Sequence, residues 1–329
     1  MVKARYPVLC LGGATIALFA ACDPGFQNPT EVLDLRPLAV VAEPPEQVLD
    51  IDPMRLPSPQ DLLALLRPVD ICGLTGDPLH REVRWSFTVC VEDVDVRCDE
   101  TRPKLLLAAG TTPDPEQTVP RPSMCARLEP TLPLLLVLQS AIEADPLAGF
   151  SGIDLLVEWK LEADGEPELY AGKRIRFAAR VPATRTANRN PSLTGLTARV
   201  GDGDEVPLQQ GRCVDQAAPL TVRAGERVAI TPVEPAGLRE AYVVPTFEGE
   251  IRQFTETIEY SWYTSGGTFS SQGSGGKRDV FGNLPGVDNT FRAPEPKRVT
   301  EPVDAAVWIV QRDERLGEAF YESCIRVTP

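Results

Sequence analysis

Apolar and polar residues alternate most regularly in the first half of the chain. Over VRWSFTVCV, the apolar side chains of Val83, Trp85, Phe87, Val89 and Val91 fall on one face. A period of two residues is typical of a strand with one buried face. The segment EVLDLRPLAVVAEPPE predicts another strand, which we expect to end at Pro44-Pro45, because proline lacks the amide hydrogen that strand pairing needs.

Two further alternating runs predict a hairpin. The first run holds Ile153, Leu155, Val157, Trp159 and Leu161, and the second holds Ile175, Phe177, Ala179 and Val181. The turn-forming segment ADGEPE lies between them. We expect this hairpin to complete a first β-sandwich domain over residues 32–181.

One helix is expected inside this domain. In LPLLLVLQSAIEAD, apolar residues repeat at helical spacing, which predicts a helix inserted between strands, with its leucine stripe packed on the core. The proline-rich segment from Asp50 to Pro68 carries LLALL and predicts either a short helix or a packed loop.

A second series of strands follows a polar segment. VPATRTANRNPS predicts a linker at residues 182–192, and a second domain is expected over 193–329. Its strands are predicted in VRAGERVAITPV, IEYSWYTSGGTF, VDAAVWIVQ and GEAFYESCIRV, with Trp262 as the core aromatic residue. The pattern therefore predicts a mainly β chain with two tandem β-sandwiches.

The first residues predict export. Lys3 and Arg5 precede an apolar stretch that is too short for a membrane span, which needs roughly 20 apolar residues. This pattern is typical of a secretory signal peptide over residues 1–21. Phe19-Ala20-Ala21-Cys22 resembles the lipobox of bacterial lipoproteins, although Phe19 stands where that family usually carries leucine.

The resemblance implies that Cys22 is lipidated and becomes the first residue of the mature chain. Residues 22–31 would then form a short tether, and two or three acyl chains would hold the protein on a bilayer. An ordinary cleaved signal with a chance cysteine and an uncleaved anchor are the alternatives. Asp23 resembles an inner-membrane retention residue, but that rule varies between lineages; we expect the bacterial cell envelope and favour the outer membrane.

Charge narrows the set of partners. The formal net charge of −14 becomes −16 once Lys3 and Arg5 are removed with the signal peptide. Binding to nucleic acid depends on lysine and arginine contacts to phosphate, so an acidic chain argues against such a partner and against an electrostatic membrane patch. The lipid is therefore the expected membrane contact.

The cysteine pattern predicts disulfides. Beyond Cys10 and Cys22, an even number of cysteines remains: Cys72, Cys90, Cys98, Cys125, Cys213 and Cys324. A bridge from Cys213 to Cys324 would join the two ends of the second domain, whereas the first four cysteines allow three connectivities. A metal site is not expected, because no CxxC pair occurs and His80 is the sole histidine.

The chain also resembles a wider group of bacterial proteins. The segments EVLDLRPLAVVAEPPE, KRIRFAARVPATRTANRNPSLTG, EYSWYTSGGTF and VWIVQRDERLGEAFYE resemble those of bacterial lipoproteins built from two Ig-like sandwich domains, a group largely without assigned activity. This resemblance implies an envelope location and an Ig-like architecture, and it implies no chemistry.

Candidate catalytic groups are few. His80 lies in the polar stretch GDPLHREV, and Ser274 and Lys277 have the SxxK spacing of serine acyl-enzymes but lie in a Gly/Ser loop. Two acidic clusters, residues 92–100 and 202–205, could hold calcium, but neither follows the EF-hand pattern, and we favour solvated turns for both. No cofactor is expected.

These observations favour a non-enzymatic binding or structural module that presents its loops to an envelope protein or glycan. The loops at 265–290 are the candidate contact surface, with Tyr263, Phe269, Phe281 and Phe291 as contact residues and core packing as the competing interpretation. A hydrolase of envelope polymers using an unrecognised carboxylate pair is the alternative, and a scaffold subunit with a fixed neighbour is a further one.

Overall fold

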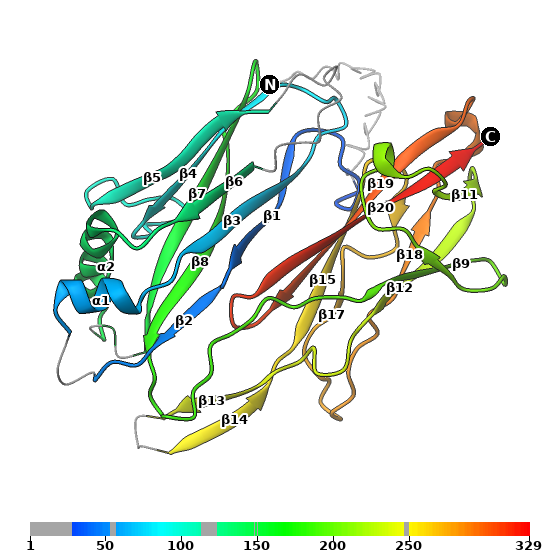
Figure 1. Cartoon of the computed structure of the whole chain (residues 1–329). Coiled ribbons are helices and arrows are strands. Elements are labelled where there is room, and N and C mark those ends of the chain that lie inside the picture. Colours follow the sequence, from blue (N-terminus) through cyan, green and yellow to red (C-terminus); the bar gives the residue numbers. More distant parts are fainter. Residues whose placement is uncertain (1–27, 53–56, 113–123, 148, 150, 247–249) are drawn as a thin grey trace, which may run out of the picture.

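The computed structural model describes residues 28–52, 57–112, 124–147, 149, 151–246 and 250–329. This part of the chain is mainly β, and its two α-helices are α1 (Pro59–Leu65) and α2 (Leu132–Ala144). Figure 1 shows two groups of strands side by side, the first formed by the N-terminal half of the chain and the second by the C-terminal half. None of the described helices has the length and apolar character needed to cross a bilayer.

Two sheets form the first group. The larger has the order β2-β8-β7-β4-β5, built from β2 (Glu46–Leu49), β4 (Val83–Cys90), β5 (Lys104–Thr111), β7 (Ile153–Ala163) and β8 (Leu169–Ala179). The smaller has the order β1-β3-β6, built from β1 (Arg36–Glu43), β3 (Val69–Gly76) and β6 (Met124–Leu128). Only β2 and β8 pair in parallel among these strands.

The core of the first group lies between its two sheets. Phe87 of β4 stacks on Trp159 of β7 with ring centroids 5.6 Å apart, and both side chains are fully buried. Gly73 of β3 faces Trp159 from the other sheet, where a Cβ atom would come within 2.5 Å of the indole. The two sheets can therefore approach closely only because residue 73 has no side chain.

The elements predicted in the first half are confirmed, and the structure adds the strands β2, β3, β5 and β6. The hairpin β7–β8 pairs Ile153 with Phe177 and Leu161 with Leu169, and β1 ends at Glu43. Helix α2 buries Leu134, Val137, Leu138, Ser140 and Ala141, and the segment before Pro68 forms the short helix α1. Of the added strands, β2 follows directly after Pro45.

The second group also has two main sheets. One has the order β10-β9-β12-β18-β16, from β9 (Gly195–Val200), β10 (Val206–Leu208), β12 (Arg227–Val233), β16 (Thr268–Phe269) and β18 (Asn289–Arg292). The other has the order β11-β20-β19-β15-β17, from β11 (Leu220–Arg223), β15 (Ile258–Thr264), β17 (Gly273–Gly275), β19 (Val303–Asp313) and β20 (Glu318–Thr328). A separate two-stranded ribbon holds β13 (Ala241–Pro245) and β14 (Ile251–Thr255).

Trp262 lies at the centre of the second core, as predicted. Its side chain is fully buried, and its ring centroid lies 5.2 Å from that of Phe269. Phe269, which belongs to the sheet facing Trp262, makes an edge contact with Phe291 on the neighbouring strand β18 of its own sheet. These three aromatic residues join the two sheets of the second group.

A third apolar cluster connects the two groups. It joins Val32, Leu38, Ala39 and Leu74 of the N-terminal half to Tyr263, Trp308 and Val310 of the C-terminal half. The expected tether is partly built into the same region, because Thr30 is 1% exposed and its carbonyl accepts a hydrogen bond from the Thr264 amide. The described start of the chain is therefore fixed to the Thr264 end of β15, and Cys22 lies outside the described residues.

Candidate functional site

The six cysteines within the described residues form three disulfides. Cys72 and Cys125 join the neighbouring strands β3 and β6, and Cys90 and Cys98 close a short loop after β4. Cys213, in the short 3-10 helix Cys213–Asp215, is bonded to Cys324 of β20, which is the pair that the sequence analysis favoured. For the first four cysteines, the structure selects one of the three connectivities left open.

Three of the four candidate contact residues are core residues. Tyr263, Phe269 and Phe291 are 8%, 3% and 0% exposed, so their assignment to a contact surface is wrong. Each lies on or at the end of a strand and points into a core, since the glycine-rich sequence around them forms short strands as well as loops. Phe281 is different, because it is 86% exposed.

Phe281 lies at the tip of an ordered turn. Asp279 holds this turn: its Oδ1 accepts hydrogen bonds from the amides of Phe281 (2.9 Å) and Asn283 (2.8 Å), and its Oδ2 accepts one from the Asn283 side chain (3.0 Å). The bonds from Asn283 hold the pKa of the Asp279 carboxyl below its usual range. Gly282 has a φ of 87°, which glycine adopts readily.

This turn leaves apolar side chains facing solvent. Val280 is 93% exposed and Phe281 is 86% exposed, and Leu284 follows them on the surface. The backbone that carries them is fixed by the Asp279 bonds and by a hydrogen bond from Arg278 Nη1 to the Gly282 carbonyl, 2.7 Å long. We call residues 277–284 the apolar tip.

The apolar tip lies at the opposite end of β15 from the N-terminal segment. The Gly276 amide, directly before the tip, donates to the carbonyl of Ile258, the first residue of β15. The Thr30 carbonyl accepts from Thr264, the last residue of that strand. A seven-residue strand spans about 20 Å, so about this distance separates the two points where these segments attach to β15.

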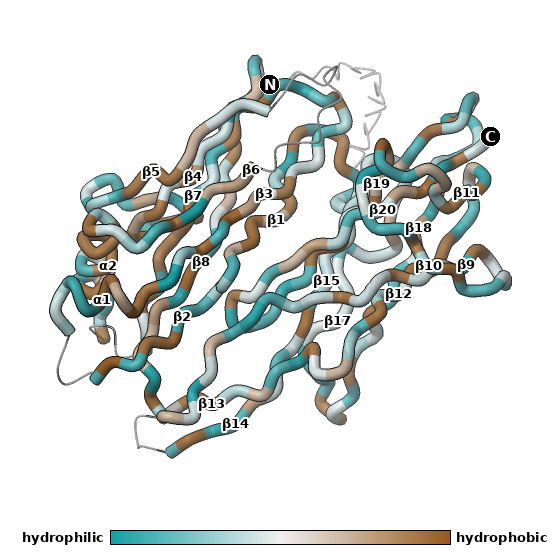
Figure 2. The backbone as a smooth tube through the Cα atoms, viewed as in Figure 1, coloured by the Kyte–Doolittle hydropathy of each residue, from teal (hydrophilic) through white to brown (hydrophobic). Residues whose placement is uncertain are grey.

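The ribbon β13–β14 lies at the same end as the apolar tip, because β14 ends three residues before β15 begins. Figure 1 shows the ribbon extending below the main sheets, and Figure 2 shows hydrophobic residues along it. Val244, Ile251 and Phe254 are exposed. Phe254 stacks on Tyr242, with ring centroids 5.5 Å apart.

The candidate catalytic residues do not form a site. His80 is exposed and lies in a turn, where its backbone φ is 51°. The Ser274 hydroxyl accepts a hydrogen bond from Trp262 Nε1 (2.9 Å) and donates one to the Val287 carbonyl (2.8 Å). Both hydrogen-bonding functions of this serine therefore serve the core, while Lys277 is exposed.

The acidic clusters are largely paired with cations or solvated. Glu92 pairs with Arg174, and Glu100 pairs with Lys104. Residues 202–205 are exposed turn residues. Within the described part of the chain, no group of three histidine, cysteine, aspartate or glutamate residues is arranged to hold a metal ion.

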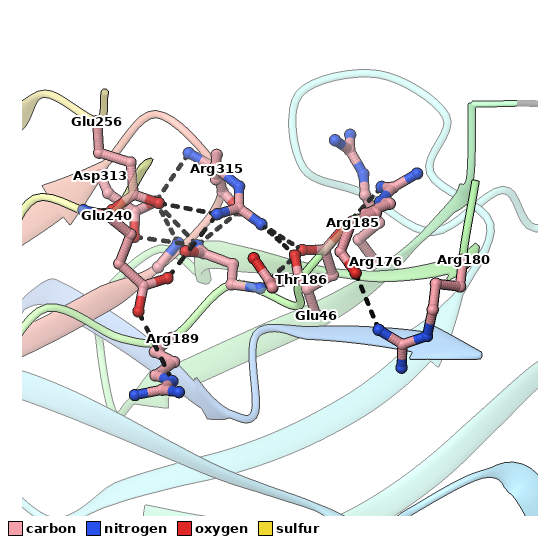
Figure 3. Close-up of polar contacts among 12 residues, drawn as sticks. Glu46, Arg176, Arg180, Arg185, Thr186, Arg189, Glu240, Glu256, Asp313 and Arg315 are labelled. Carbon is pink, nitrogen blue, oxygen red and sulfur yellow. Dashed lines mark hydrogen bonds and ion pairs between the residues drawn. The ribbon is translucent and has the colours of Figure 1, made fainter. Parts of the chain in front are cut away.

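The structure adds a polar joint between the two strand groups (Figure 3), which the sequence analysis did not identify. Arg315, in the β19–β20 turn, contacts Glu46 of β2 at 2.8 Å and Glu256 at 3.2 Å. It also donates to the Thr186 carbonyl of the predicted linker at 2.9 Å. Arg185 of that segment pairs with Glu46 at 2.8 Å. One arginine thus connects the first group, the linker and the second group.

A second buried ion pair reinforces this joint. Lys173 of β8 lies 3.3 Å from Glu318 of β20, and both side chains are buried. Burial is the main cause that lowers the pKa of Lys173, and Glu318 opposes it. Asn190 adds two hydrogen bonds to backbone groups: its side-chain amide donates to the Ala42 carbonyl, and its side-chain oxygen accepts from the Glu318 amide.

Glu256 is the most strongly perturbed carboxyl group in this joint. Its side chain is almost completely buried, and this burial raises its pKa to about 7. The backbone amide of Glu240 and the Arg315 guanidinium oppose the rise, whereas Asp313 adds to it. A glutamate of this kind can act as a general acid, but the Glu256 side chain is almost completely buried and is paired with Arg315.

A cavity of about 290 Å³ opens beside the joint. Arg176, Arg185 and Thr186 line one side, and Tyr242, Val243 and Val244 of the ribbon line the other. Arg315 and Glu46, whose ion pair is drawn in Figure 3, also line the cavity, as do Leu147 and Ser151.

Comparison with known proteins identifies no relative by sequence. No family model matches the chain, and no curated protein matches it. Among solved structures, the C-terminal domain of the AgI/II polypeptide BspA from Streptococcus agalactiae is 8% identical, over 79% of this chain and 92% of that chain, with a TM-score of 0.21. A second chain, titled BspA_C_WT, is 9% identical with the same TM-score, over 79% of this chain and 93% of that one. A likeness at this score carries no conclusion about function.

Proposed function

We propose that this protein is a lipid-anchored module of the bacterial cell envelope that binds a protein or glycan partner and catalyses no reaction. In this proposal, Cys22 carries the lipid, and the two strand groups are Ig-like sandwich domains that hold the apolar tip away from the membrane. The outer membrane is the favoured location.

The exposed side chains of Val280 and Phe281 are the observation that carries the proposal. Covering a large, water-exposed apolar side chain with a partner stabilises the complex, by about 2 kcal/mol for a phenylalanine. Four hydrogen bonds that involve side chains within residues 278–283 fix the backbone beneath them. A partner therefore meets an ordered turn, and little conformational entropy is lost on binding.

The position of the apolar tip supports a partner other than the anchoring bilayer. The described N-terminal segment is attached at the Thr264 end of β15, and the tip lies beyond Ile258 at the other end. A chain lipidated at Cys22 would leave the membrane near the first of these ends. The tip would then face the periplasm or the cell exterior, where proteins and glycans are the available partners.

The contacts between the two strand groups support the proposal that the protein holds the apolar tip in a fixed position. Arg315 and Lys173 make buried ion pairs between the two groups, and the apolar cluster around Trp308 packs between them. Breaking a buried ion pair leaves an unpaired charge and costs several kcal/mol, so these contacts resist bending between the groups. A stiff body keeps the tip at a fixed distance from the anchor.

Site-specific photocrosslinking in the native cells tests this proposal. A photoreactive amino acid replaces Phe281 in the full-length chain, and the matched control carries it at Val214, which is 83% exposed near Cys213 at the opposite end of the second group. We expect a discrete product from position 281 and none from position 214. Equal products from both positions, or none from position 281, would contradict the proposal.

A further inference from the structure

The cavity beside the joint has unused hydrogen-bond donors on one side. Arg176 donates two hydrogen bonds to Asp154, from Nε and from Nη2, and each is 2.7 Å long. Arg185 donates one to Glu46 from Nη2. Among the described residues, Arg176 Nη1 and the Nε and Nη1 of Arg185 have no hydrogen-bond partner. Figure 3 shows the two side chains next to each other beside Glu46.

The opposite side of the cavity is apolar. Val243, Val244 and the Tyr242 ring line it, and all three belong to β13. Tyr242 is held in place because its hydroxyl donates to Glu314 at 2.9 Å and because Arg315 lies over its ring, 4.9 Å from the centroid. The cavity thus combines a fixed apolar wall with arginine donors.

The hydrogen-bond donors of the lining favour an anion. Three arginines and one glutamate line the cavity, and that glutamate, Glu46, already accepts bonds from Arg185 and Arg315. Asp154 and Glu256, which pair with Arg176 and Arg315 from outside the lining, balance the remaining positive charge, so the unused guanidinium donors are what would recognise an anion here. A guanidinium group matches the planar oxygen pair of a carboxylate, and a volume of about 290 Å³ accommodates a small ligand.

We propose that this cavity binds a small monocarboxylate with an apolar body, its carboxylate at Arg176 and Arg185 and its apolar part against Val243 and Val244. The terminal residue of a peptide and a short fatty acid share this chemistry. Glu46 and Arg176 belong to strands β2 and β8 of the first group, whereas Val243 and Val244 belong to β13 of the second. A ligand in this cavity would therefore lie between the two strand groups. This inference does not depend on a partner at the apolar tip.

Titration calorimetry on the purified full-length chain tests the inference with three probes. N-acetylleucine represents a peptide terminus, octanoate represents a fatty acid, and N-acetylleucine amide is the neutral control. We expect one or both acids to bind and the amide to bind at least about tenfold more weakly, since it lacks the charge that the arginines recognise. Equal binding of the acid and the amide, or no binding of either acid, would overturn the inference.

Two substitutions locate the site. Val244→Glu adds a carboxylate to the apolar wall and is expected to weaken binding of the acid at least about tenfold, because like charges repel. Val244 is partly exposed, so the change is compatible with folding. Ile251→Glu, on the other strand of the same ribbon and outside the cavity lining, is the matched control and should bind as the unmodified chain does. Unchanged binding by Val244→Glu would also overturn the inference.

Discussion

Replacing Glu256 by glutamine tests the electrostatics of the joint. Glutamine has the shape of a protonated glutamate and cannot ionise. Burial raises the pKa of Glu256 from 4.5 to about 7, so ionising this side chain in the folded protein costs about 3 kcal/mol more than in the unfolded chain. Glu240, Asp313 and Arg315 are the charged groups that face it.

The sign of the effect follows from the direction of the pKa shift. Below pH 4.5 Glu256 is protonated in both states, and its contribution to the stability of the native protein is fully present. That contribution is lost as the pH rises through about 7. We therefore expect Glu256→Gln to match the unmodified protein near pH 4.5 and to exceed its stability by up to about 3 kcal/mol at pH 8.

Urea unfolding at intervals between pH 4.5 and 8 measures this difference. Glu162→Gln is the control, because Lys160 lowers the pKa of the exposed Glu162 carboxyl and its titration falls below this range. A difference between Glu256→Gln and the unmodified protein that does not change with pH would refute the reasoning. A variant that loses stability as the pH rises would show that the ion pair with Arg315 outweighs burial.

Two further predictions concern stability. The bond between Cys213 and Cys324 closes a loop with a sequence separation of 111 residues, so replacing both by alanine should lower the free energy of unfolding by about 5 kcal/mol in the chain-entropy model, measured by urea unfolding; an unchanged midpoint would contradict this. Phe291→Ala, in the core, should cost about 3–5 kcal/mol, whereas Phe281→Ala should change stability by less than about 0.5 kcal/mol. Similar losses from both phenylalanine variants would show that Phe281 is packed in solution.

The alternation of apolar and polar residues was sufficient to predict the strands that bury one face. The alternation at Val83–Val91 and in the hairpin that begins at Ile153 predicted β4, β7 and β8, because each strand contributes one apolar face to a core. The ribbon β13–β14 was not predicted. All five residues of β14 are exposed, so its sequence lacks the alternation that burial on one face requires.

Contacts between distant residues could not be predicted in the same way. Glu46 and Arg315 form the centre of the joint although they are 269 positions apart, and neither residue lies in a distinctive motif. The aromatic residues around 265–290 show a related difficulty. Glycine-rich sequence predicts loops, but Phe269 and Phe291 pair with each other on the short strands β16 and β18, and β18 pairs in turn with β12. The exposure of Phe281 depends on the local bonds of Asp279.

Membrane attachment through Cys22 is the central claim of this account, and the intact mass of the protein extracted from its native membrane tests it most directly. The account predicts a chain that begins at Cys22, carries the added mass of acyl chains, and gains two hydrogens on reduction for each of the three described disulfides. A chain that begins elsewhere, or that carries no acyl mass, would contradict the lipid anchor and with it the proposed orientation of the apolar tip.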